Sequence, residues 1–294
     1  MTDIAPRMSV LLVTYNHAKF VAQALDSILM QRTDFEFEII AVDDCSTDDT
    51  LAILRRYEGQ HSRLRVLAAE TNLGISRNYQ RGFAACRGEF VAVLEGDDYW
   101  ISPRKLQIMS DFLKRNPVCS FCFHRVIRYD PHPEKAALYP PQWTAEQLLT
   151  VSELASGNFI GGFSTCVYRR EIIVGLKPEL WELDIREWFF NIVVAEYGPI
   201  GYVPEILSVY RAHPGGIWSM QPVSYRTSEL IRLIESYDPF LEFRFTKQFQ
   251  SFTQEVSRPI LPDSDEWPLY WKIRIGIASR LPVRVKKTLK RFLR

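Results

Sequence analysis

Hydrophobic and polar residues are arranged along the first third of the chain in blocks that predict alternating strands and helices. Apolar runs rich in β-branched residues begin near Ser9, Glu36, Arg63 and Glu89, at nearly even spacing. The stretches between these runs have helical periodicity, as in residues 18–31. Strands that alternate with helices predict βαβ units, so we expect an α/β fold with a mixed, mainly parallel sheet flanked by helices.

The pattern after residue 100 predicts further elements and then a change of character. The expected elements are a helix over 103–115, a strand over 118–125, a proline-rich surface loop over 129–141 and a helix over 184–196. Gly198 and Pro199 mark the end of the last helix, because neither residue continues a helix well. Beyond Trp218 the apolar residues are spaced as in amphipathic helices, so we expect a helical extension at the C-terminal end.

Composition adds a size limit and a charge asymmetry to this picture. With 294 residues, of which 47% are hydrophobic, the chain is long enough for a large core. The net charge of +1 gives no general attraction for nucleic acid, and no nucleic-acid partner is expected. The segment from Lys272 to Arg294 nevertheless holds nine basic residues and no acidic ones, and subtracting these from +1 leaves −8 for the rest of the chain.

The C-terminal residues 267–294 combine this basic charge with apolar and aromatic side chains at helical spacing. Such a segment is typical of a helix that lies on an anionic membrane surface. A helix packed on the main domain, with its lysines in solvent, also explains the pattern. No leader precedes Met8, and no apolar run reaches the roughly 20 residues that span a bilayer. We therefore expect a cytoplasmic protein, peripheral on the inner face of the membrane if the tail binds lipid.

Polar clusters follow each of the four strands predicted in the first half. Ligands of parallel sheets bind beyond the carboxyl ends of the strands, so these clusters are candidate binding groups. They are Thr14, Tyr15 and Asn16 after the first strand, Asp43 and Asp44 after the second, Asn72 and Arg77 after the third, and Glu95, Asp97 and Asp98 after the fourth.

The clusters after the first three strands have the chemistry to bind a nucleotide. Asp43 and Asp44 follow an apolar strand, where carboxylates are costly unless they bind a ligand or cap a helix. A carboxylate there accepts hydrogen bonds from the N–H of a uracil-like base or from a ribose. Arg77, on the first turn of a predicted helix, is placed to meet a phosphate. Helix capping by the acids and simple exposure of Arg77 are the alternatives.

The cluster after the fourth strand has the chemistry of a metal site. Glu95, Asp97 and Asp98 supply three carboxylates at one strand end, and Mg2+ or Mn2+ bind such oxygen ligands. A cation held there would bridge two phosphates and neutralise a leaving diphosphate. A solvated acidic turn is the alternative, but it does not explain why all the polar clusters fall at one end of one sheet.

Taken together, these motifs resemble family 2 glycosyltransferases, which have the GT-A fold. The resemblance covers roughly residues 8–215 and rests on Thr14-Tyr15-Asn16, Val42-Asp43-Asp44, Asn72-Leu73-Gly74 with Arg77-Asn78, Gly88-Glu89-Phe90, and Asp97-Asp98 with Pro103 and Lys105-Leu106. It implies that Asp44 binds the base and Arg77 the nucleotide. It also implies that Asp97 contacts the ribose or the metal and that Asp98 is the direct metal ligand. Glu95 stands where the family has the first aspartate of its Asp-x-Asp motif.

The same resemblance implies a catalytic base in the second half. Glu187, which precedes Trp188 at a predicted helix start, matches the acid that accepts the proton of the acceptor hydroxyl. Asp184 is held in reserve, because the family more often has an aspartate as the base. The alternative is a first-turn acid that the helix dipole favours.

Two further segments are assigned by resemblance. Residues 210–213, Tyr-Arg-Ala-His, are similar to the family's Tyr-Arg-x-His segment. This implies that His213 completes the metal sphere or contacts the diphosphate and that Arg211 braces the loop or binds phosphates. An ordinary buried histidine is the alternative for His213. Asn158 and Thr165 lie in the stretch where the family shapes its acceptor site.

The implied activity is an inverting transfer of a sugar from a UDP- or dTDP-sugar to a hydroxyl of a saccharide or lipid-linked acceptor. It would use Mn2+ or Mg2+ and serve the synthesis of a bacterial surface polysaccharide. We expect two domains, a glycosyltransferase domain over 1–218 and a helical extension over 219–294. Within the first domain, residues 1–125 would form the nucleotide-sugar-binding half and residues 126–218 the acceptor and catalytic half. A non-catalytic sugar-nucleotide-binding scaffold is one alternative. A nucleotidyltransferase is another, although Lys19 stands near the first strand without the glycines of a phosphate loop.

Overall fold

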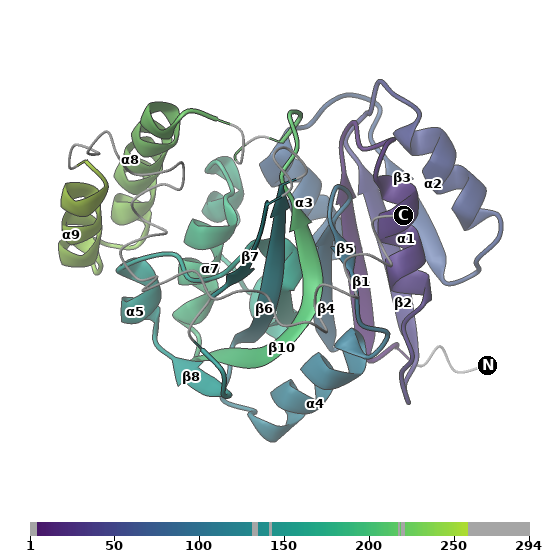
Figure 1. Cartoon of the computed structure of the whole chain (residues 1–294), viewed down its shortest axis with the longest axis horizontal. Helices are drawn as coiled ribbons and strands as arrows, with labels where there is room; N and C mark the ends of the chain where they lie inside the picture. Colours follow the sequence, from purple (N-terminus) through teal and green to yellow (C-terminus); the bar gives the residue numbers. More distant parts are fainter. Residues whose placement is uncertain (1–4, 131–134, 141–142, 217, 219–220, 258–294) are drawn as a thin grey trace.

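The computed structural model describes residues 5–130, 135–140, 143–216, 218 and 221–257, which form a mixed sheet with helices on both faces (Figure 1). The strands are β1 (Met8–Thr14), β2 (Phe37–Asp43), β3 (Leu64–Ala68), β4 (Phe90–Glu95), β5 (Tyr99–Trp100), β6 (Phe121–Asp130), β7 (Lys135–Tyr139), β8 (Gln147–Leu149), β9 (Cys166–Arg169) and β10 (Ile200–Arg211). The α-helices are α1 (Val21–Leu29), α2 (Thr50–Glu58), α3 (Ile75–Ala85), α4 (Lys105–Arg115), α5 (Val151–Ala155), α6 (Arg170–Val174), α7 (Glu187–Ala195), α8 (Val223–Phe240) and α9 (Thr246–Val256). Two 3-10 helices are η1 (Phe163–Thr165) and η2 (Pro178–Glu182).

The strands of the described residues form one sheet in the order β3-β2-β1-β4-β9-β6-β10-β5, with β7 paired to β6 and β8 to β10. The ladders β1–β2, β1–β4, β2–β3 and β6–β10 are parallel and hold most of the paired residues. Strands β5, β7, β8 and β9 run antiparallel to their neighbours. The predicted α/β fold with a mixed, mainly parallel sheet is therefore confirmed.

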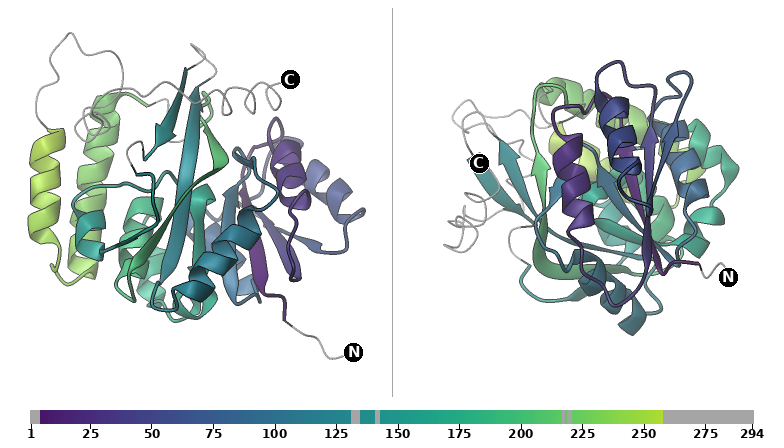
Figure 2. Two further views of the ribbon diagram at one scale, coloured as in Figure 1. Left: turned by 60° about the horizontal axis from the view of Figure 1, so that its bottom comes forward. Right: turned by 90° about the vertical axis from the view of Figure 1, so that its right-hand side faces the viewer.

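The two faces of the sheet bury two separate cores, because successive side chains of a strand point to opposite faces. Val10 and Leu12 of β1 pack in a cluster with side chains of α1, α2 and α4. Leu11 and Val13 of the same strand pack in a second cluster with side chains of α3, α7, α8 and α9. The resulting arrangement is a sheet between two layers of helices (Figures 1 and 2).

Glycines at two contacts let helices approach the sheet closely. A β-carbon added at Gly82 of α3 would lie 2.6 Å from Leu11 Cδ1. One added at Gly201 of β10 would lie 2.1 Å from Phe112 Cε1 of α4. Since both distances are shorter than van der Waals contact, a larger residue at either site would push the helix away from the strands.

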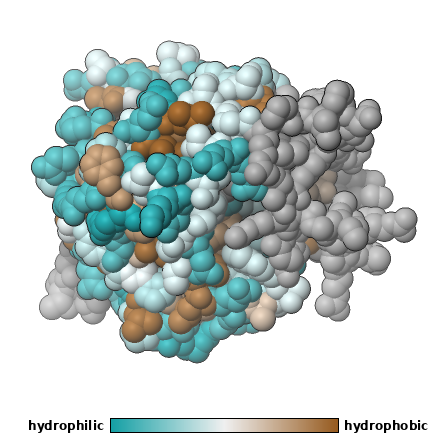
Figure 3. Space-filling view, turned by 90° about the vertical axis from the view of Figure 1, so that its left-hand side faces the viewer, coloured by the Kyte–Doolittle hydropathy of each residue, from teal (hydrophilic) through white to brown (hydrophobic). Residues whose placement is uncertain are grey.

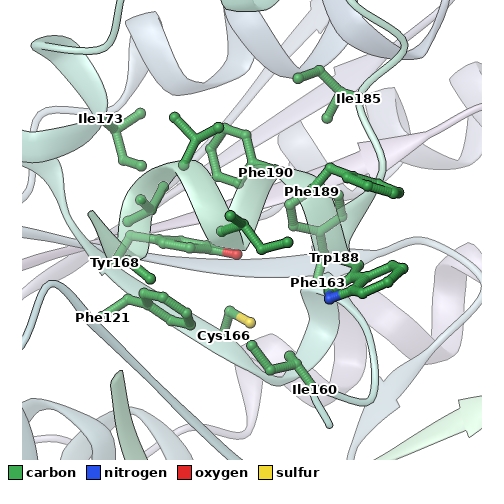
Figure 4. Close-up of a cluster of buried hydrophobic side chains, with 14 of the residues drawn as sticks. Phe121, Ile160, Phe163, Cys166, Tyr168, Ile173, Ile185, Trp188, Phe189 and Phe190 are labelled. Carbon is green, nitrogen blue, oxygen red and sulfur yellow. The ribbon is translucent and has the colours of Figure 1, made fainter. Parts of the chain in front are cut away.

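Aromatic side chains anchor α7 to the sheet (Figure 4). The ring of Phe190 stacks on Phe83, with centroids 5.5 Å apart, and lies 5.5 Å from Phe163 and 5.6 Å from Tyr168. The buried hydroxyl of Tyr168 on β9 donates a 2.6 Å hydrogen bond to Asn191 Oδ1 on α7. Aromatic packing and a satisfied buried hydroxyl together fix the position of α7, and with it the residues at its N-terminus.

One prediction for the middle of the chain was wrong, and one strand was not predicted at all. The expected surface loop over 129–141 contains β7, which pairs with β6. The long strand β10 was missed because Pro204 and Glu205 interrupt its apolar pattern. The register against β6 shifts between Val203 and Ile206, and such irregularities accommodate a proline within a strand.

The helices beyond residue 218 share the core of the main domain. Leu233 and Tyr237 of α8 and Phe249 and Phe252 of α9 belong to the same buried cluster as Trp188 of α7. Figure 3 shows this side of the molecule as mainly hydrophilic or pale, with separate hydrophobic patches. The domain boundaries at 125/126 and 218/219 stay predictions, and β6 runs across the first of them.

The basic amphipathic tail over 267–294 lies outside the described residues. Among the residues that are described, no helix combines the length and the apolar character needed to cross a bilayer.

We predict that Phe190→Ala lowers the free energy of unfolding by about 3–5 kcal/mol, because it leaves a cavity among the rings of Phe83, Phe163 and Tyr168. Chemical denaturation of the purified protein measures this change. Val174→Ala on the outer face of α6, where Val174 is 54% exposed, is the matched control and should change the same quantity by about 0.5 kcal/mol or less. Equal effects of the two substitutions would contradict the assignment of Phe190 to the core.

Candidate active site

The carboxyl ends of β1, β2, β3 and β4 lie side by side and define one rim of the sheet. In the ladders, Thr14 is paired with Asp43, Asp43 with Ala68, and Val13 with Glu95. The loops that follow these strands therefore meet at the same edge, as the sequence predicts for a ligand site.

Asp43 ties the loops after β1 and β2 together. Its Oδ1 accepts hydrogen bonds from Thr14 Oγ1 at 3.0 Å and from Ser46 Oγ at 2.6 Å, and its Oδ2 accepts one from Ser46 N at 2.9 Å. Asn16 has a φ of 56°, and its Oδ1 accepts a 2.8 Å hydrogen bond from Thr47 N. Thr14 and Asp43 are thus buried beneath the loops, whereas Tyr15, which is 44% exposed, and Asn16 are accessible at the surface.

Asp44 holds the loop between β3 and α3 in the same way. Its carboxylate accepts hydrogen bonds from Leu73 N at 2.8 Å and Gly74 N at 3.0 Å. Gly74 has a φ of +80°, a backbone conformation that suits glycine. Asn72 donates to the Asp44 carbonyl at 3.2 Å. The structure therefore brings Asp44 and Asn72 together in one hydrogen-bonded loop beside Asp43.

Arg77 and Arg81 differ in what they contact, although both lie on α3. Arg77, predicted to meet the nucleotide, pairs with Glu182 of η2, and its side chain is 45% exposed. Arg81, which the sequence analysis missed, donates through Nη2 to the Asp43 carbonyl at 2.6 Å. Arg81 therefore supports the end of β2 directly, and no local sequence pattern marks this contact.

Four carboxylates gather where β4 ends. Burial raises the pKa of Glu95 well above its ordinary value, and the nearby charges of Asp97, Asp98 and Glu187 raise it further. Tyr79 of α3 donates a 3.1 Å hydrogen bond to Glu95 Oε1. The influence of Glu187 on Glu95 indicates that the end of β4 and the start of α7 face a common space.

Asp97 is the carboxylate of this group that meets histidines. Its Oδ2 lies 3.0 Å from His213 Nε2 and 3.8 Å from His17 Nε2, and its side chain is 22% exposed. Burial alone would raise the pKa of Asp97, but the hydrogen bond with His213 and the charge of His17 lower it overall. Burial also lowers the pKa of His17, and Asp97 opposes that shift.

Asp98 faces inward instead of joining Asp97. It is only 1% exposed, and its Oδ1 accepts a 2.9 Å hydrogen bond from Arg211 N. Burial raises the pKa of Asp98 to about 8, with a further contribution from Asp97. Its Oδ2 is buried and has no hydrogen-bond partner among the described residues, so the role of Asp98 as the direct metal ligand stays a prediction. Asp97 is the more accessible carboxylate of the two.

Arg211 braces the end of β10 against the first half of the chain. Its guanidinium donates to the Asp97 carbonyl and to Gln23 Oε1 of α1. It lies over the rings of Phe20 and Tyr99, with its Cζ 4.7 and 4.9 Å from their centroids. Of the two roles that resemblance implied, bracing of the loop matches these contacts.

The residues near Asp97 suit a cation that is shared with a phosphate-bearing ligand. Within the part of the chain that the structure describes, no three His, Cys, Asp or Glu side chains are already arranged around one point as a metal site. Mg2+ and similar cations are often held by only one or two protein carboxylates together with substrate phosphates. The oxygen of Asp97 and the imidazole of His213 fit such an incomplete set of ligands.

Glu187 and Asp184 lie close in sequence but have different partners. Glu187, on the first turn of α7, accepts a 2.7 Å hydrogen bond from Asn158 Nδ2, and burial raises its pKa while this bond opposes the rise. Asp184 Oδ2 accepts hydrogen bonds from Arg186 at 3.2 Å and from Arg232 at 2.6 Å. Because Asp184 is bound to two cationic arginines and Glu187 to a neutral amide, Glu187 fits the role of proton acceptor better than Asp184.

Asn158 and Thr165, the two expected acceptor contacts, have separate positions. Asn158 meets Glu187 directly, whereas Thr165 is fully buried and donates a 2.8 Å hydrogen bond to the Gly162 carbonyl. Asn158 is thus at the site, and Thr165 supports the turn beneath it.

Lys105 lies buried beneath the acidic group. Its Nζ donates a 2.6 Å hydrogen bond to the Ser164 carbonyl and lies 4.1 Å from the centroid of the Trp100 ring. Ser164 Oγ in turn accepts a 3.1 Å hydrogen bond from Glu95 N. Burial holds the pKa of Lys105 well below its ordinary value, although Asp98 is among the groups that raise it.

Solved structures share this fold. Staphylococcus aureus TarS 1–349 in complex with UDP-GlcNAc matches with a TM-score of 0.61 and 21% identity, covering 84% of this chain and 71% of that chain. The mannosyltransferase PcManGT from Pyrobaculum calidifontis, in complex with GDP-Man and Mn2+, matches with a TM-score of 0.61 and 17% identity, covering 85% and 70%. These matches define the architecture as the GT-A fold.

Sequence comparison identifies the family. The model of glycosyl transferase family 2 matches residues 9–175, which is more than half of the chain, and the chain therefore belongs to this family. Mycobacterium tuberculosis Rv1520 is 34% identical over 213 residues, 72% of this chain and 60% of that protein. Bacillus subtilis TuaG is 28% identical over 171 residues, 58% of this chain and 66% of that protein. The chain thus spans less than two thirds of the length of these relatives.

We predict that Lys105 makes stability depend on pH above neutrality. Because the pKa of Lys105 is lowered in the folded protein but is about 10.4 in an unfolded chain, the unfolded state binds more protons between these values. The stability of the wild type relative to Lys105→Met should therefore rise as the pH increases from 7 to 9. Chemical denaturation of both proteins across this range checks the difference, and parallel pH profiles would contradict a desolvated Lys105.

Proposed function

We propose that the chain is an enzyme that transfers a sugar from a nucleoside-diphosphate donor to an acceptor hydroxyl, with a divalent cation and with inversion at the anomeric carbon. The observation that carries this proposal is the convergence of Asp97, His213 and Glu187 at the end of the sheet where the nucleotide loops meet. Membership of glycosyl transferase family 2 supports the reaction class. The complex of TarS with UDP-GlcNAc supports a uridine nucleotide as the donor carrier, ahead of a dTDP-sugar.

The nucleotide end of the site is already organised by its own hydrogen bonds. Asp44, Asn72 and Gly74 hold one loop, and Asp43 with Asn16 holds the other. Tyr15 is exposed beside them and offers a ring on which a base can stack. Preorganised loops of this kind bind a base and ribose without a further cost of ordering.

Asp97 and His213 would hold the cation at the diphosphate. When bound, Mn2+ or Mg2+ neutralises the charge that develops on the leaving diphosphate. PcManGT in its complex with GDP-Man and Mn2+ supports this assignment. Asp98 and Arg211 fix the turn that carries Asp97, since the Asp98 carboxylate and the Asp97 carbonyl are both bound to Arg211.

Glu187 is the proposed base. Its carboxylate accepts the proton of the acceptor hydroxyl as that oxygen forms a bond to the anomeric carbon. The bond from this carbon to the diphosphate oxygen breaks on the opposite side, which inverts the anomeric centre. Asn158 orients the Glu187 carboxylate through its hydrogen bond, and burial raises the pKa of Glu187 toward a value that suits proton transfer.

The acceptor is proposed to be a saccharide or a lipid-linked polymer in the synthesis of a bacterial surface polysaccharide. TuaG is named for teichuronic acid biosynthesis, and TarS is a poly(ribitol-phosphate) beta-N-acetylglucosaminyltransferase; both names support a polymeric acceptor. A cytoplasmic location, with residues 267–294 on the inner face of the membrane, remains a prediction from the sequence.

A non-catalytic sugar-nucleotide-binding scaffold is the alternative, and Glu187→Gln distinguishes it from an enzyme. Because the substitution removes the proton acceptor and keeps the shape, it should lower the turnover of donor and acceptor by about 100-fold to 10,000-fold without weakening UDP binding. Release of UDP during incubation with a nucleotide sugar and an acceptor extract measures turnover.

Asp184→Asn is the matched control for this test. It removes a carboxylate three residues away that is bound to two arginines, and it should retain most of the activity. Loss of activity in Asp184→Asn with normal activity in Glu187→Gln would reverse the assignment. Absence of turnover in the wild type, with UDP bound normally, would favour the scaffold.

The cation assignment makes a separate prediction. In Asp97→Asn, Mn2+ should no longer strengthen UDP binding, because the substituted amide carries no charge to attract the cation. Titration calorimetry of UDP with and without Mn2+ measures this coupling. Asp34→Asn, an exposed acid that precedes β2 at the opposite edge of the sheet, is the control and should leave the coupling intact. Mn2+ coupling that survives in Asp97→Asn would place the cation elsewhere.

A further inference from the structure

His17 is a histidine at the site that none of the roles proposed above uses. It lies in the loop between β1 and α1, and its side chain is 19% exposed. Its Nε2 is 3.8 Å from Asp97 Oδ2, the same oxygen that lies 3.0 Å from His213 Nε2. Two imidazoles from distant parts of the chain therefore approach one carboxylate oxygen.

The backbone of His17 explains the position of the residue but not the choice of a histidine. Its carbonyl accepts hydrogen bonds from Phe20 N at 2.8 Å and Val21 N at 2.9 Å, and its N–H donates a 2.7 Å hydrogen bond to Thr50 Oγ1. The ring Nδ1 is buried without a partner among the described residues, and Nε2 is beyond hydrogen-bonding distance of Asp97. Since a buried polar atom without a partner is costly, the start of α1 alone does not account for an imidazole here.

The turn after β4 leaves room for this ring. A β-carbon added at Gly96 would lie 2.8 Å from His17 Nδ1 and 2.7 Å from Thr14 Cγ2. Both distances are shorter than van der Waals contact, so a larger residue at this position would push the His17 ring away from the turn that carries Asp97.

Phe20 holds the loop of His17 against the segment of His213. The centroid of its ring is 4.6 Å from that of His213, and the Arg211 Cζ is 4.7 Å from the same ring. Because Phe20 follows His17 by three residues, one short segment positions both histidines. His17, Asp97 and His213 thus come from three segments of the chain that are packed against one another.

The spacing of these three side chains fits a single cation. Ligands at about 2.0–2.2 Å from a metal ion are about 3 Å apart when they occupy adjacent positions of an octahedron. The 3.0 Å separation of His213 Nε2 and Asp97 Oδ2 matches this spacing, and the separation for His17 is 3.8 Å. A small shift of the His17 ring therefore lets all three side chains bind one cation.

We propose that His17 is a further protein ligand of the cation, and that the two imidazoles make the site select a transition-metal ion such as Mn2+ over Mg2+. Mg2+ prefers oxygen ligands, whereas the affinity of sites with imidazole nitrogen rises along the first-row metals from Mn2+ onward. The inference rests on the proposed function only in taking this cation to be the one that is shared with the donor diphosphate.

Metal titrations of the full chain by calorimetry, at saturating UDP, test the selectivity. His17→Phe keeps a ring but removes both nitrogens, so it should lower the affinity for Mn2+ about tenfold or more and the affinity for Mg2+ less than about threefold. The ratio of the two affinities should therefore fall. His61→Phe is the matched control, because His61 stacks on Tyr57 between α2 and β3, and it should keep both affinities.

His17→Asp tests the same point with an oxygen ligand, and it serves also if the phenylalanine variant does not fold. The carboxylate should retain cation binding and shift the preference toward Mg2+, a change that a purely structural role of His17 does not predict. An unchanged ratio of Mn2+ to Mg2+ affinity in either folded variant would overturn the proposal. A loss of UDP affinity in His17→Phe without any metal would assign His17 to the diphosphate and would also overturn it.

Pulsed electron paramagnetic resonance of bound Mn2+ counts the imidazoles directly. The wild type should show coupling to the nitrogens of two imidazoles, and His17→Phe and His213→Phe should each show coupling to one. A single imidazole in the wild type, together with sugar transfer, would overturn this proposal and leave the proposed function standing. Two imidazoles without sugar transfer from any nucleotide sugar would support the metal site and count against the proposed function.

Discussion

The crowding of carboxylates at the end of β4 is the constraint on which the rest of the site depends. Burial raises the pKa of Glu95, and the nearby charges of Asp97, Asp98 and Glu187 raise it further. Such a group disfavours the folded state unless neighbouring donors or cations offset the repulsion. Tyr79, Arg211, His213 and Asn158 each donate to or pair with one of these acids.

The fold supports these acids from two directions. The parallel ladders fix the end of β4 beside the ends of β1 and β2, and the aromatic core fixes α7 and therefore Glu187. Lys105 and Ser164 connect the buried layer beneath to the backbone of Glu95. A site that must hold charged substrates is thus built on rigid elements, which limits how far its acids can move apart.

The sequence predicted most of the fold and the location of the site, because apolar periodicity and the positions of strand ends are local properties. The acids after β2 and β4 are at one rim, as their places after strands require. The direction in which each side chain points was not predictable. Asp97 and Asp98 are adjacent in one turn, yet one faces histidines and the other is buried against Arg211. Only the contact with β10, a strand that Pro204 concealed, distinguishes them.

Residues that act through distant partners were missed for the same reason. Arg81 supports Asp43 across 38 positions of sequence, and no local pattern marks that contact. Lys105 was noted only as part of a family motif, and its burial beneath the site depends on the packing of α4 on the sheet.

A crystal structure with a UDP-sugar and Mn2+, in which anomalous scattering locates the cation, tests the central claim most directly. The claim predicts a manganese peak at about 2.0–2.3 Å from an Asp97 carboxylate oxygen, shared with the diphosphate, and Glu187 facing the anomeric carbon from the opposite side. A cation bound away from Asp97, or a sugar that lies out of reach of Glu187, would contradict it.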